Sequence, residues 1–175
     1  MNYHGTEKTS LTNGEGIRTV LWVAGCNHHC KGCQNPDTWN PDGGELFDLE
    51  KDYEVIRDLV SKPYRHGLTL SGGDPMYPAN RAVVYGICKK FRADFGDSKN
   101  IWMYTGYRFA EISDDPILDL VDVIVDGEYI ESQRNINRQW CGSENQVIWR
   151  KQDGKWVAEE PKYAETIESR TGMDM

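Results

Sequence analysis

Short apolar runs alternate with longer amphipathic stretches over most of this chain. Runs rich in β-branched and aromatic residues predict buried strands, and they cover residues 17–23, 67–71, 101–105 and 121–126. Apolar residues at helical spacing predict helices, and these cover residues 48–61, 79–95 and, more briefly, 116–120. Asp48 is the expected cap of the first helix. Residues 1–16 are polar and end in Asn13-Gly14-Glu15-Gly16, which is typical of a turn.

Strands that alternate with helices predict parallel βαβ units, and therefore an α/β fold. A closed eight-stranded barrel needs about 250 residues, so we expect a partial (βα) barrel that is open on one side. Residues 146–157 predict a C-terminal β-hairpin with a type I′ turn at Asp153-Gly154. We expect one domain over residues 1–158 and a short, charged, flexible tail over residues 159–175.

Composition and charge narrow the classes of function. The chain has 175 residues, with 20 Lys and Arg against 28 Asp and Glu, giving a net charge of −8. This balance, without a basic block, argues against nucleic acid as a partner. No apolar run reaches the roughly 18 residues of a membrane span, and no signal peptide is visible. We therefore expect a cytoplasmic protein without a membrane partner. The five cysteines, an odd number, do not suggest a disulfide scaffold.

Three of the cysteines, Cys26, Cys30 and Cys33, follow the first predicted strand at spacings of four and three. Thiolates favour zinc, cuprous copper or iron–sulfur clusters. One interpretation is a structural zinc site completed by His28 or His29, although a second pair of ligands is missing. Another is a thiol-redox motif at Cys30 and Cys33. The favoured interpretation is a [4Fe–4S] cluster, which normally takes four cysteines and would here keep one iron open for another ligand.

A second informative element is Gly72-Gly73, which follows the strand at residues 67–71. Glycine allows close approach of the backbone to a ligand, and strand ends are where α/β proteins bind small molecules. A tight turn without a ligand is the alternative. The cysteines, this glycine pair and Thr105-Gly106 all follow parallel strands, so we expect them on the same C-terminal rim.

Several residues receive a structural interpretation. Cys88 lies on the apolar face of a helix and is expected to be a small buried hydrophobe. Arg18 is expected to be a solvated residue at a strand end, and residues 128–140 a solvated loop. Trp102 and Tyr104 are expected in the core or a pocket wall. Cys141 is conceivable as a fourth cluster ligand, but it would block the open iron.

The cysteine pattern resembles the signature of the radical S-adenosylmethionine (SAM) superfamily, and further motifs narrow the resemblance. Over roughly residues 1–150 the chain is similar to the family of activating proteins of anaerobic ribonucleoside-triphosphate reductases. The motifs that carry this likeness occur in the same order: Asn13 to Arg18, Cys26 to Asn35, Ser71 to Pro75, Trp102 to Tyr107 and Gly142 to Gln146. Asp74 and Gly32 deviate from the superfamily but match this subgroup. Cys141 stands where the family usually has arginine.

The resemblance implies an activase that reductively cleaves SAM and uses the 5′-deoxyadenosyl radical to form a glycyl radical on the anaerobic reductase. It implies metal ligation by Cys26, Cys30 and Cys33, SAM contacts at Gly72 and Gly73, and adenine contacts by the backbone of Gly32 to Gln34. The implied cofactors are a [4Fe–4S] cluster and SAM. The implied partners are the reductase and a small electron donor such as a flavodoxin. The alternatives are a radical SAM enzyme with another substrate, or a zinc-binding interaction module without catalysis.

Overall fold

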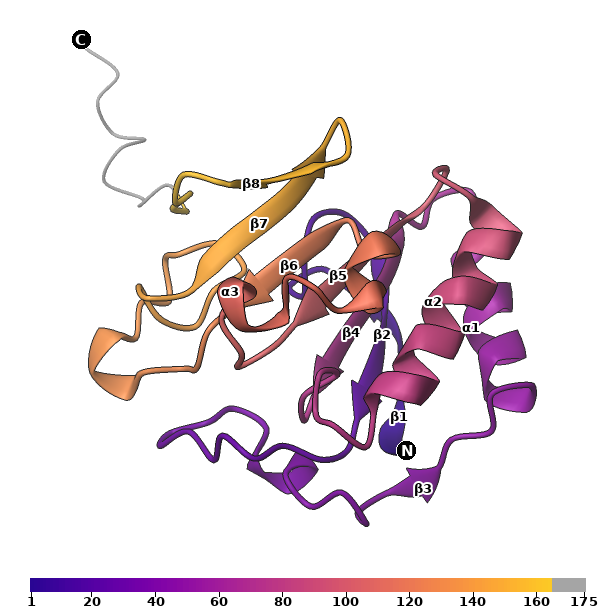
Figure 1. The fold of residues 1–175 in the computed structure, drawn as a ribbon, viewed down its shortest axis with the longest axis horizontal. Coiled ribbons are helices and arrows are strands. Elements are labelled where there is room, and N and C mark those ends of the chain that lie inside the picture. The colour runs from indigo at the N-terminus through magenta and orange to yellow at the C-terminus, as the bar shows by residue number, and fades with distance from the viewer. Residues whose placement is uncertain (165–175) are drawn as a thin grey trace, which may run out of the picture.

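The computed structural model describes residues 1–164, which form one eight-stranded sheet with the order β3-β1-β2-β4-β5-β6-β7-β8 (Figure 1). The strands are β1 (Asn2–Ser10), β2 (Arg18–Val23), β3 (Glu45–Leu46), β4 (Gly67–Gly72), β5 (Asn100–Tyr104), β6 (Val123–Asp126), β7 (Val147–Gln152) and β8 (Lys155–Ala158). The α-helices are α1 (Lys51–Val60), α2 (Arg81–Phe95) and α3 (Phe109–Ile112). Short 3₁₀ helices are η1 (Pro36–Thr38), η2 (Pro116–Asp119) and η3 (Glu131–Gln133).

The four central strands confirm the predicted parallel units. β2, β4, β5 and β6 pair side by side in parallel, and α1 and α2 connect the first three of them. Antiparallel strands flank this centre, with β1 and β3 on one side and β7 and β8 on the other. The mixed α/β class is therefore confirmed. The pairing describes an open sheet edged by β3 and β8, and closure toward a barrel stays a prediction.

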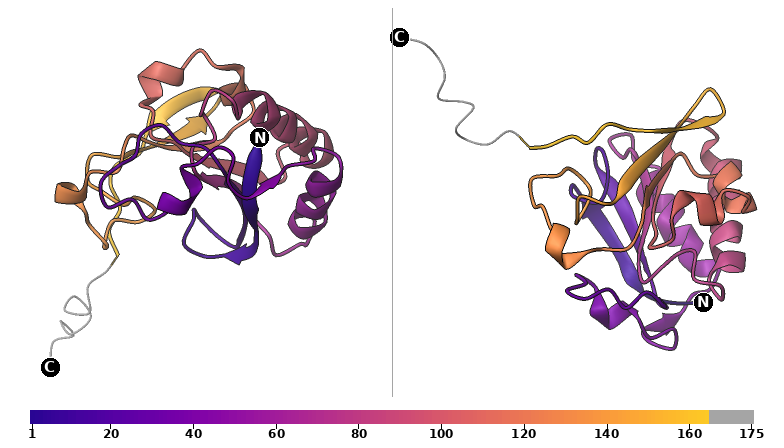
Figure 2. Two further views of the ribbon diagram at one scale, coloured as in Figure 1. Left: turned by 90° about the horizontal axis from the view of Figure 1, so that it is seen from below. Right: turned by 60° about the vertical axis from the view of Figure 1, so that its left-hand side comes forward.

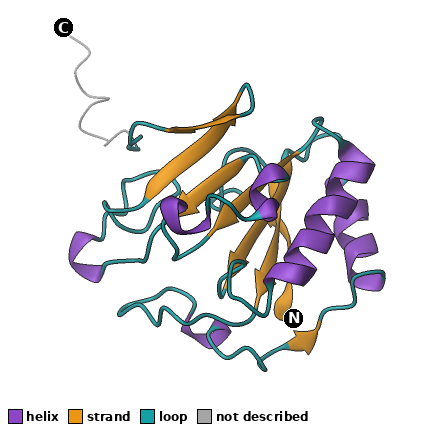
Figure 3. Cartoon of the chain, viewed as in Figure 1, coloured by secondary structure: helices purple, strands orange, loops and turns teal. Residues whose placement is uncertain are grey.

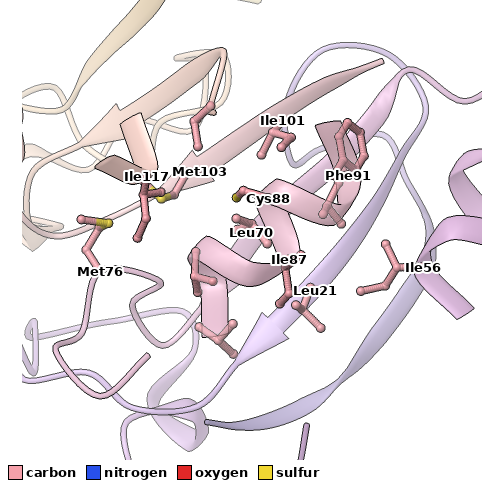
Figure 4. Packing of buried hydrophobic residues seen from close by; sticks show 14 of the residues in the cluster. Leu21, Ile56, Leu70, Met76, Ile87, Cys88, Phe91, Ile101, Met103 and Ile117 are labelled. Atoms are coloured by element: carbon pink, nitrogen blue, oxygen red, sulfur yellow. The ribbon is translucent and has the colours of Figure 1, made fainter. Parts of the chain in front are cut away.

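The two long helices lie side by side on one face of the sheet, and the segment around η3 lies beyond the other face (Figures 1 and 2). Side chains alternate between the faces, as the pleat of a strand requires. Figure 4 shows the helix side of this alternation, where strand residues meet α1 and α2. The labelled residues of this core are Leu21, Ile56, Leu70, Met76, Ile87, Cys88, Phe91, Ile101, Met103 and Ile117. Cys88 is fully buried there, which confirms its predicted structural place.

The helix predicted over residues 48–61 begins at Lys51, because Asp48 lies before the helix and caps its first turn. Asp48 Oδ1 accepts hydrogen bonds from the backbone N–H groups of Glu50 and Lys51, at 2.9 and 3.0 Å. Such a side chain satisfies donors that the first turn leaves without partners. Asp48 thus caps the entry to the helix as predicted, although α1 itself runs from Lys51 to Val60 and the residue directly before it is Glu50.

The opposite face carries a second apolar cluster, formed by Trp102, Val123, Val125, Cys141 and Ile148. Arg18 also lies on this side of the sheet, and the expectation that it is solvated is wrong. Its side chain is 0% exposed and donates hydrogen bonds to Thr69, Asn100 and carbonyl groups around it. An arginine in a strand is buried here because the neighbouring strands satisfy its donors.

The sequence pattern did not predict β1. Its residues are mostly polar, and the strand is only partly covered, because β3 beside it is two residues long. The turn that follows β1 packs closely against the sheet. A Cβ at Gly14 would lie 2.8 Å from the Trp102 ring, and a Cβ at Gly16 would overlap the His66 ring. These glycines therefore allow both a positive φ and close packing.

The C-terminal hairpin confirms the prediction. β7 and β8 pair antiparallel through Asp153 and Gly154, which both have positive φ, as a type I′ turn requires. The hairpin extends the sheet at β6, and Trp149 stacks on Phe109 with ring centroids 4.4 Å apart.

Residues after β8 run beside the segment that precedes β7. Gln139 N–H donates to the Lys162 carbonyl at 2.9 Å, and Ala164 N–H donates to the Asn137 carbonyl at 2.7 Å. The predicted domain limit and flexible tail stay predictions, and residues 165–175 lie outside the described residues. No helix among residues 1–164 combines the length and apolar character that crossing a membrane requires.

Candidate metal and cofactor site

A cavity of about 610 Å³ opens where the central parallel strands end. Its lining brings together segments that are far apart in the sequence: Cys26, Cys30 and Cys33 after β2, Gly72 and Gly73 at the end of β4, and Thr105 and Gly106 after β5. Figure 3 shows the loops that gather at these carboxyl ends. The predicted common rim is therefore confirmed, at the edge of a parallel sheet where ligands commonly bind.

The cysteine loop, residues 25–35, is held at both of its ends by backbone hydrogen bonds. Gly25 N–H donates to the Thr38 carbonyl at 2.8 Å, and Cys26 N–H donates to the Trp39 carbonyl at 3.1 Å. At the other end, Thr38 N–H donates to the Asn35 carbonyl at 3.1 Å, and within the loop Cys33 N–H donates to the Cys30 carbonyl at 3.1 Å. All three thiols of this loop are partly buried and free of disulfides.

Burial changes the acidity of these thiols. It raises the pKa of Cys26 to about 11, and it also raises the pKa of Cys30. Both thiols are therefore protonated at neutral pH in the metal-free chain. Binding of iron would displace these protons, since the thiolate is the form that binds metal.

The glycine pair is required by close packing between two strand ends. A Cβ at Gly72 would lie 2.7 Å from the Val23 carbonyl oxygen, and a Cβ at Gly73 would overlap the Gly25 carbonyl group. Gly73 N–H donates to Val23 and Asp74 N–H donates to Gly25, both at 2.8 Å. The pair thus joins β4 to the start of the cysteine loop, while its exposed side lines the cavity.

Asp74 binds groups from three parts of the site. Its carboxylate is 1% exposed and accepts hydrogen bonds from Thr105 Oγ1 at 3.1 Å and from Gly106 N–H at 2.9 Å. His28 Nε2 lies 3.0 Å from the same oxygen, and His28 Nδ1 lies 2.9 Å from Glu128 Oε1. The hydrogen bond to Asp74 raises the pKa of His28; burial opposes this effect and Glu128 adds to it.

The segment Gly142 to Gln146 closes the cavity on the β6 side through its own side chains. Gln146 Oε1 accepts from the N–H groups of Gly142 and Ser143, and its Nε2 donates to the Gly127 carbonyl at 3.0 Å. Asn145 Nδ2 donates to the Glu128 carbonyl at 2.8 Å. This motif therefore shapes a loop and fixes it to the end of β6.

The structure places all but one of the predicted site residues around the cavity. Cys26, Cys30, Cys33, Gln34, Gly72 and Gly73 line it. Gly32 is not among the lining residues, because it faces the Glu131 side chain, whose Oε1 would lie 2.9 Å from a Cβ there. The roles of these residues as ligands stay predictions.

Most of one wall of the cavity was not indicated by the sequence, although Tyr104 was expected in the core or a pocket wall. Tyr104 and residues 136–142 form this wall, and Leu11 lies at its rim. Arg138 is 6% exposed and donates to the carbonyl groups of Glu144 and Gln146, so the expectation of a fully solvated loop is wrong at this residue. Cys141 also lines the cavity, and its conceivable role as a fourth cluster ligand stays a prediction.

The donor set fits an iron–sulfur cluster better than a zinc ion. Both ring nitrogens of His28 face carboxylates, so His28 does not offer a free nitrogen to a metal held by the thiols. Among residues 1–164, no three side chains of Cys, His, Asp or Glu lie close enough together to bind a single metal ion. In a cluster, each thiolate binds a different iron, so the thiols need not converge on one point.

Comparison with known proteins defines the class of this site. A family model described as a 4Fe-4S single cluster domain matches residues 12–149. This region contains the three cysteines and every strand of the parallel centre. The protein thus has an iron–sulfur cluster domain whose sequence offers three clustered thiols.

Individual relatives define the family. Anaerobic ribonucleoside-triphosphate reductase-activating proteins are similar to this chain in Enterobacteria phage T4 (44% identity over 89% of this chain and 98% of the relative) and Vibrio cholerae (42% over 86% and 98%). The protein of the same name from Escherichia coli K12 is 36% identical over 85% of this chain and 97% of its own length. The chain belongs to this family of activating proteins.

Proposed function

We propose that this chain is a radical SAM enzyme that activates an anaerobic ribonucleoside-triphosphate reductase. In this proposal Cys26, Cys30 and Cys33 hold a [4Fe–4S] cluster, and Gly72 and Gly73 contact the methionyl amino group of SAM. The observation that carries it is that three thiols and a glycine pair, from different strands, line one cavity of about 610 Å³. The names of relatives that align over almost their whole length support the choice of partner.

The bound cluster would supply the electron that splits the sulfonium of SAM into methionine and a 5′-deoxyadenosyl radical. The radical would take a hydrogen atom from a backbone glycine of the reductase, leaving 5′-deoxyadenosine and a glycyl radical. The chain itself contributes binding, orientation and shielding from water. Its cavity walls come from both sides of the parallel centre, which suits a radical that must be kept from solvent.

The rim of the cavity supports a macromolecular substrate. Leu11 is 69% exposed and Ile136 is 78% exposed, and both lie where the cavity meets solvent. Exposed apolar residues at the mouth of a site favour contact with another protein surface. A flexible loop of the reductase that carries the target glycine would fit this opening.

The proposal extends to the setting, the reductant and the remaining contacts of the site. We propose a cytoplasmic setting because the five cysteines are free thiols, as a reducing compartment requires. A small electron donor such as a flavodoxin remains the proposed reductant. We also retain the barrel-like curvature and the single domain of residues 1–158 as proposals. Gly32 and Gln34 remain proposed backbone contacts to adenine, although Gly32 lies outside the cavity lining.

The test separates the cluster, the SAM reaction and the partner. Anaerobic reconstitution should give about four iron and four sulfide per chain, whereas zinc without sulfide would reject the proposal. Incubation with SAM and a strong reductant should yield methionine and 5′-deoxyadenosine. Adding the anaerobic reductase should then give a glycyl radical signal in electron paramagnetic resonance (EPR) spectra. SAM cleavage without that signal would leave the radical SAM assignment and remove the reductase as the substrate.

The matched control is a cysteine outside the site. Cys26→Ala should abolish all three results, while Cys88→Ala should retain them, because Cys88 is fully buried in the helix-side core. Equal loss from both variants would mean that the effect comes from the fold and not from the ligand.

A further inference from the structure

We propose that His28 is a positioning residue, which fixes the middle of the cysteine loop to the ends of β4 and β5 through Asp74. This proposal rests on the proposed function, because the two thiols that His28 would position are proposed cluster ligands. His28 lies between Cys26 and Cys30, two residues from each. It is therefore the side chain best placed to control both.

The partner of His28 is a buried carboxylate. The Asp74 carboxylate is 1% exposed, and its Oδ1 accepts a hydrogen bond from the Met76 N–H at 2.8 Å. Its Oδ2 accepts from Thr105 and Gly106, and lies 3.0 Å from His28 Nε2. Because the hydrogen bonds of the Asp74 carboxylate are all made to groups of the protein itself, its role is structural. It holds together the loops that follow β2, β4 and β5.

The His28 imidazole is closely packed on several sides. A Cβ at Gly106 would lie 2.7 Å from His28 Nε2, so the ring occupies space that only glycine leaves free. Tyr107 packs edge-on against the ring with centroids 4.7 Å apart, and Glu128 binds the second nitrogen. The φ angle of Gly106 is not positive, so its backbone conformation does not require glycine. The requirement for glycine comes instead from the space that the His28 ring occupies.

The packed imidazole is linked to the thiols through the backbone of the cysteine loop. Backbone hydrogen bonds hold the loop at its two ends, at Gly25 and Cys26 and at Asn35, and a further one from Cys33 to Cys30 lies within the loop. Between these ends, Asn27 accepts a hydrogen bond from Tyr107 Oη at 3.3 Å, the His29 ring packs against Trp39, and Lys31 pairs with Glu131. Those three side chains are exposed, whereas the His28 side chain is only 10% exposed and is bonded to the buried Asp74. Holding His28 therefore fixes the path of the backbone from which the Cys26 and Cys30 thiols reach the cavity.

The test begins with the metal-free protein, so that it does not depend on the cluster. Hydrogen exchange of the amides of residues 27–33 should become about tenfold faster in His28→Ala, because a local anchor is lost. Gly106→Ala should have a similar effect, because the added methyl group displaces the ring. The double variant should be no faster than either single variant, since both remove the same contact.

The matched controls probe the same loop. His29→Asn removes a ring contact with Trp39 but no buried hydrogen bond, and the positive φ of residue 29 suits asparagine, so its exchange should stay close to that of the wild type. His28→Gln should recover most of the protection, because its amide can donate to Asp74 as Nε2 does. Wild-type exchange in His28→Ala, or independent and additive effects of His28→Ala and Gly106→Ala, would overturn the proposal.

The second measurement uses the reconstituted protein. A chelator should remove iron from His28→Ala and Gly106→Ala several times faster than from the wild type and His29→Asn, and the EPR spectrum of the reduced cluster should change in the first two only. Equal rates and spectra in all four proteins would overturn the proposal. If the wild type takes up no iron, the proposed function fails, while the exchange experiment still decides the role of His28.

Discussion

Arg18 Nε donates a 2.7 Å hydrogen bond to the hydroxyl group of Thr69, and that hydroxyl donates a 2.7 Å bond to the Asn13 carbonyl. This relay joins β2, β4 and the turn after β1. The other guanidinium nitrogens donate to Glu15, Leu68 and Asn100. A fully buried arginine with every donor used is therefore a central element of the fold.

Replacing this guanidinium should destabilise the protein. Arg18→Lys keeps the charge but leaves buried acceptors without donors, each costing about 1–3 kcal/mol. We expect a loss of about 3 kcal/mol in the free energy of unfolding, measured by urea denaturation at unchanged m-value. Arg57→Lys is the control, because Arg57 is half exposed and pairs with Glu54 on the surface of α1. Equal midpoints for the two variants would contradict the structural role.

The cysteines should divide into ligands and structural residues. Alanine at Cys26, Cys30 or Cys33 should abolish cluster assembly, measured as iron and sulfide per chain. Alanine at Cys88 should leave both unchanged. The Cys141 thiol also lines the cavity, so it is either a cluster ligand or a part of the cavity wall, and Cys141→Ala decides between these two roles. Retention of the cluster is expected, and its loss would identify Cys141 as a fourth ligand.

The buried Cys88 thiol should make stability depend on alkaline pH. Burial raises the pKa of Cys88 from 9.0 to about 12. Between these values the unfolded chain loses the thiol proton while the folded chain keeps it, so stability is full below pH 9 and falls as pH rises toward 12. The slope of this contribution is about 1.4 kcal/mol per pH unit.

Comparison of wild type and Cys88→Ala isolates this effect. Both proteins contain the other titrating groups, so the difference in their unfolding free energies should narrow steadily between pH 9 and 12. The measurement is urea denaturation of the metal-free proteins at several pH values in this range. A constant difference would show that Cys88 titrates with an ordinary pKa in the folded protein.

Two glycines should respond differently to alanine. Gly73→Ala should destabilise the protein and disturb the cysteine loop, because its methyl group meets the Gly25 backbone. Gly86→Ala meets only the flexible end of Leu49, 2.9 Å away, and improves the helix propensity of α2 by up to about 1 kcal/mol. Thermal unfolding should therefore show a lower midpoint for Gly73→Ala and an unchanged or higher midpoint for Gly86→Ala.

Local pattern was sufficient to predict the central strands and helices of this protein. Residues 67–71 and 121–126 form apolar runs of strand length, and the helix predicted over residues 79–95 was found at Arg81–Phe95. The strand ends then place the cysteines and the glycine pair at one edge of the sheet. For this reason the general position of the site follows from the sequence.

Contacts between distant segments could not be predicted in this way. His28 and Asp74 are separated by 46 residues, and nothing near either of them indicates the other. Arg18 resembles a solvated charge until the strands that satisfy it are in place. β1 is polar because it lies toward the edge of the sheet, where the apolar pattern of a buried strand is not needed.

The cavity is assembled from segments between Leu11 and Ala164, although its three clustered thiols lie within the first 33 residues. A ribosome releases the N-terminal part of the chain first. These thiols therefore leave it long before Gly106, Glu128 and Cys141 exist to enclose them. Iron delivered during synthesis would meet an exposed, reactive peptide, so maturation of this protein should follow the completion of its chain.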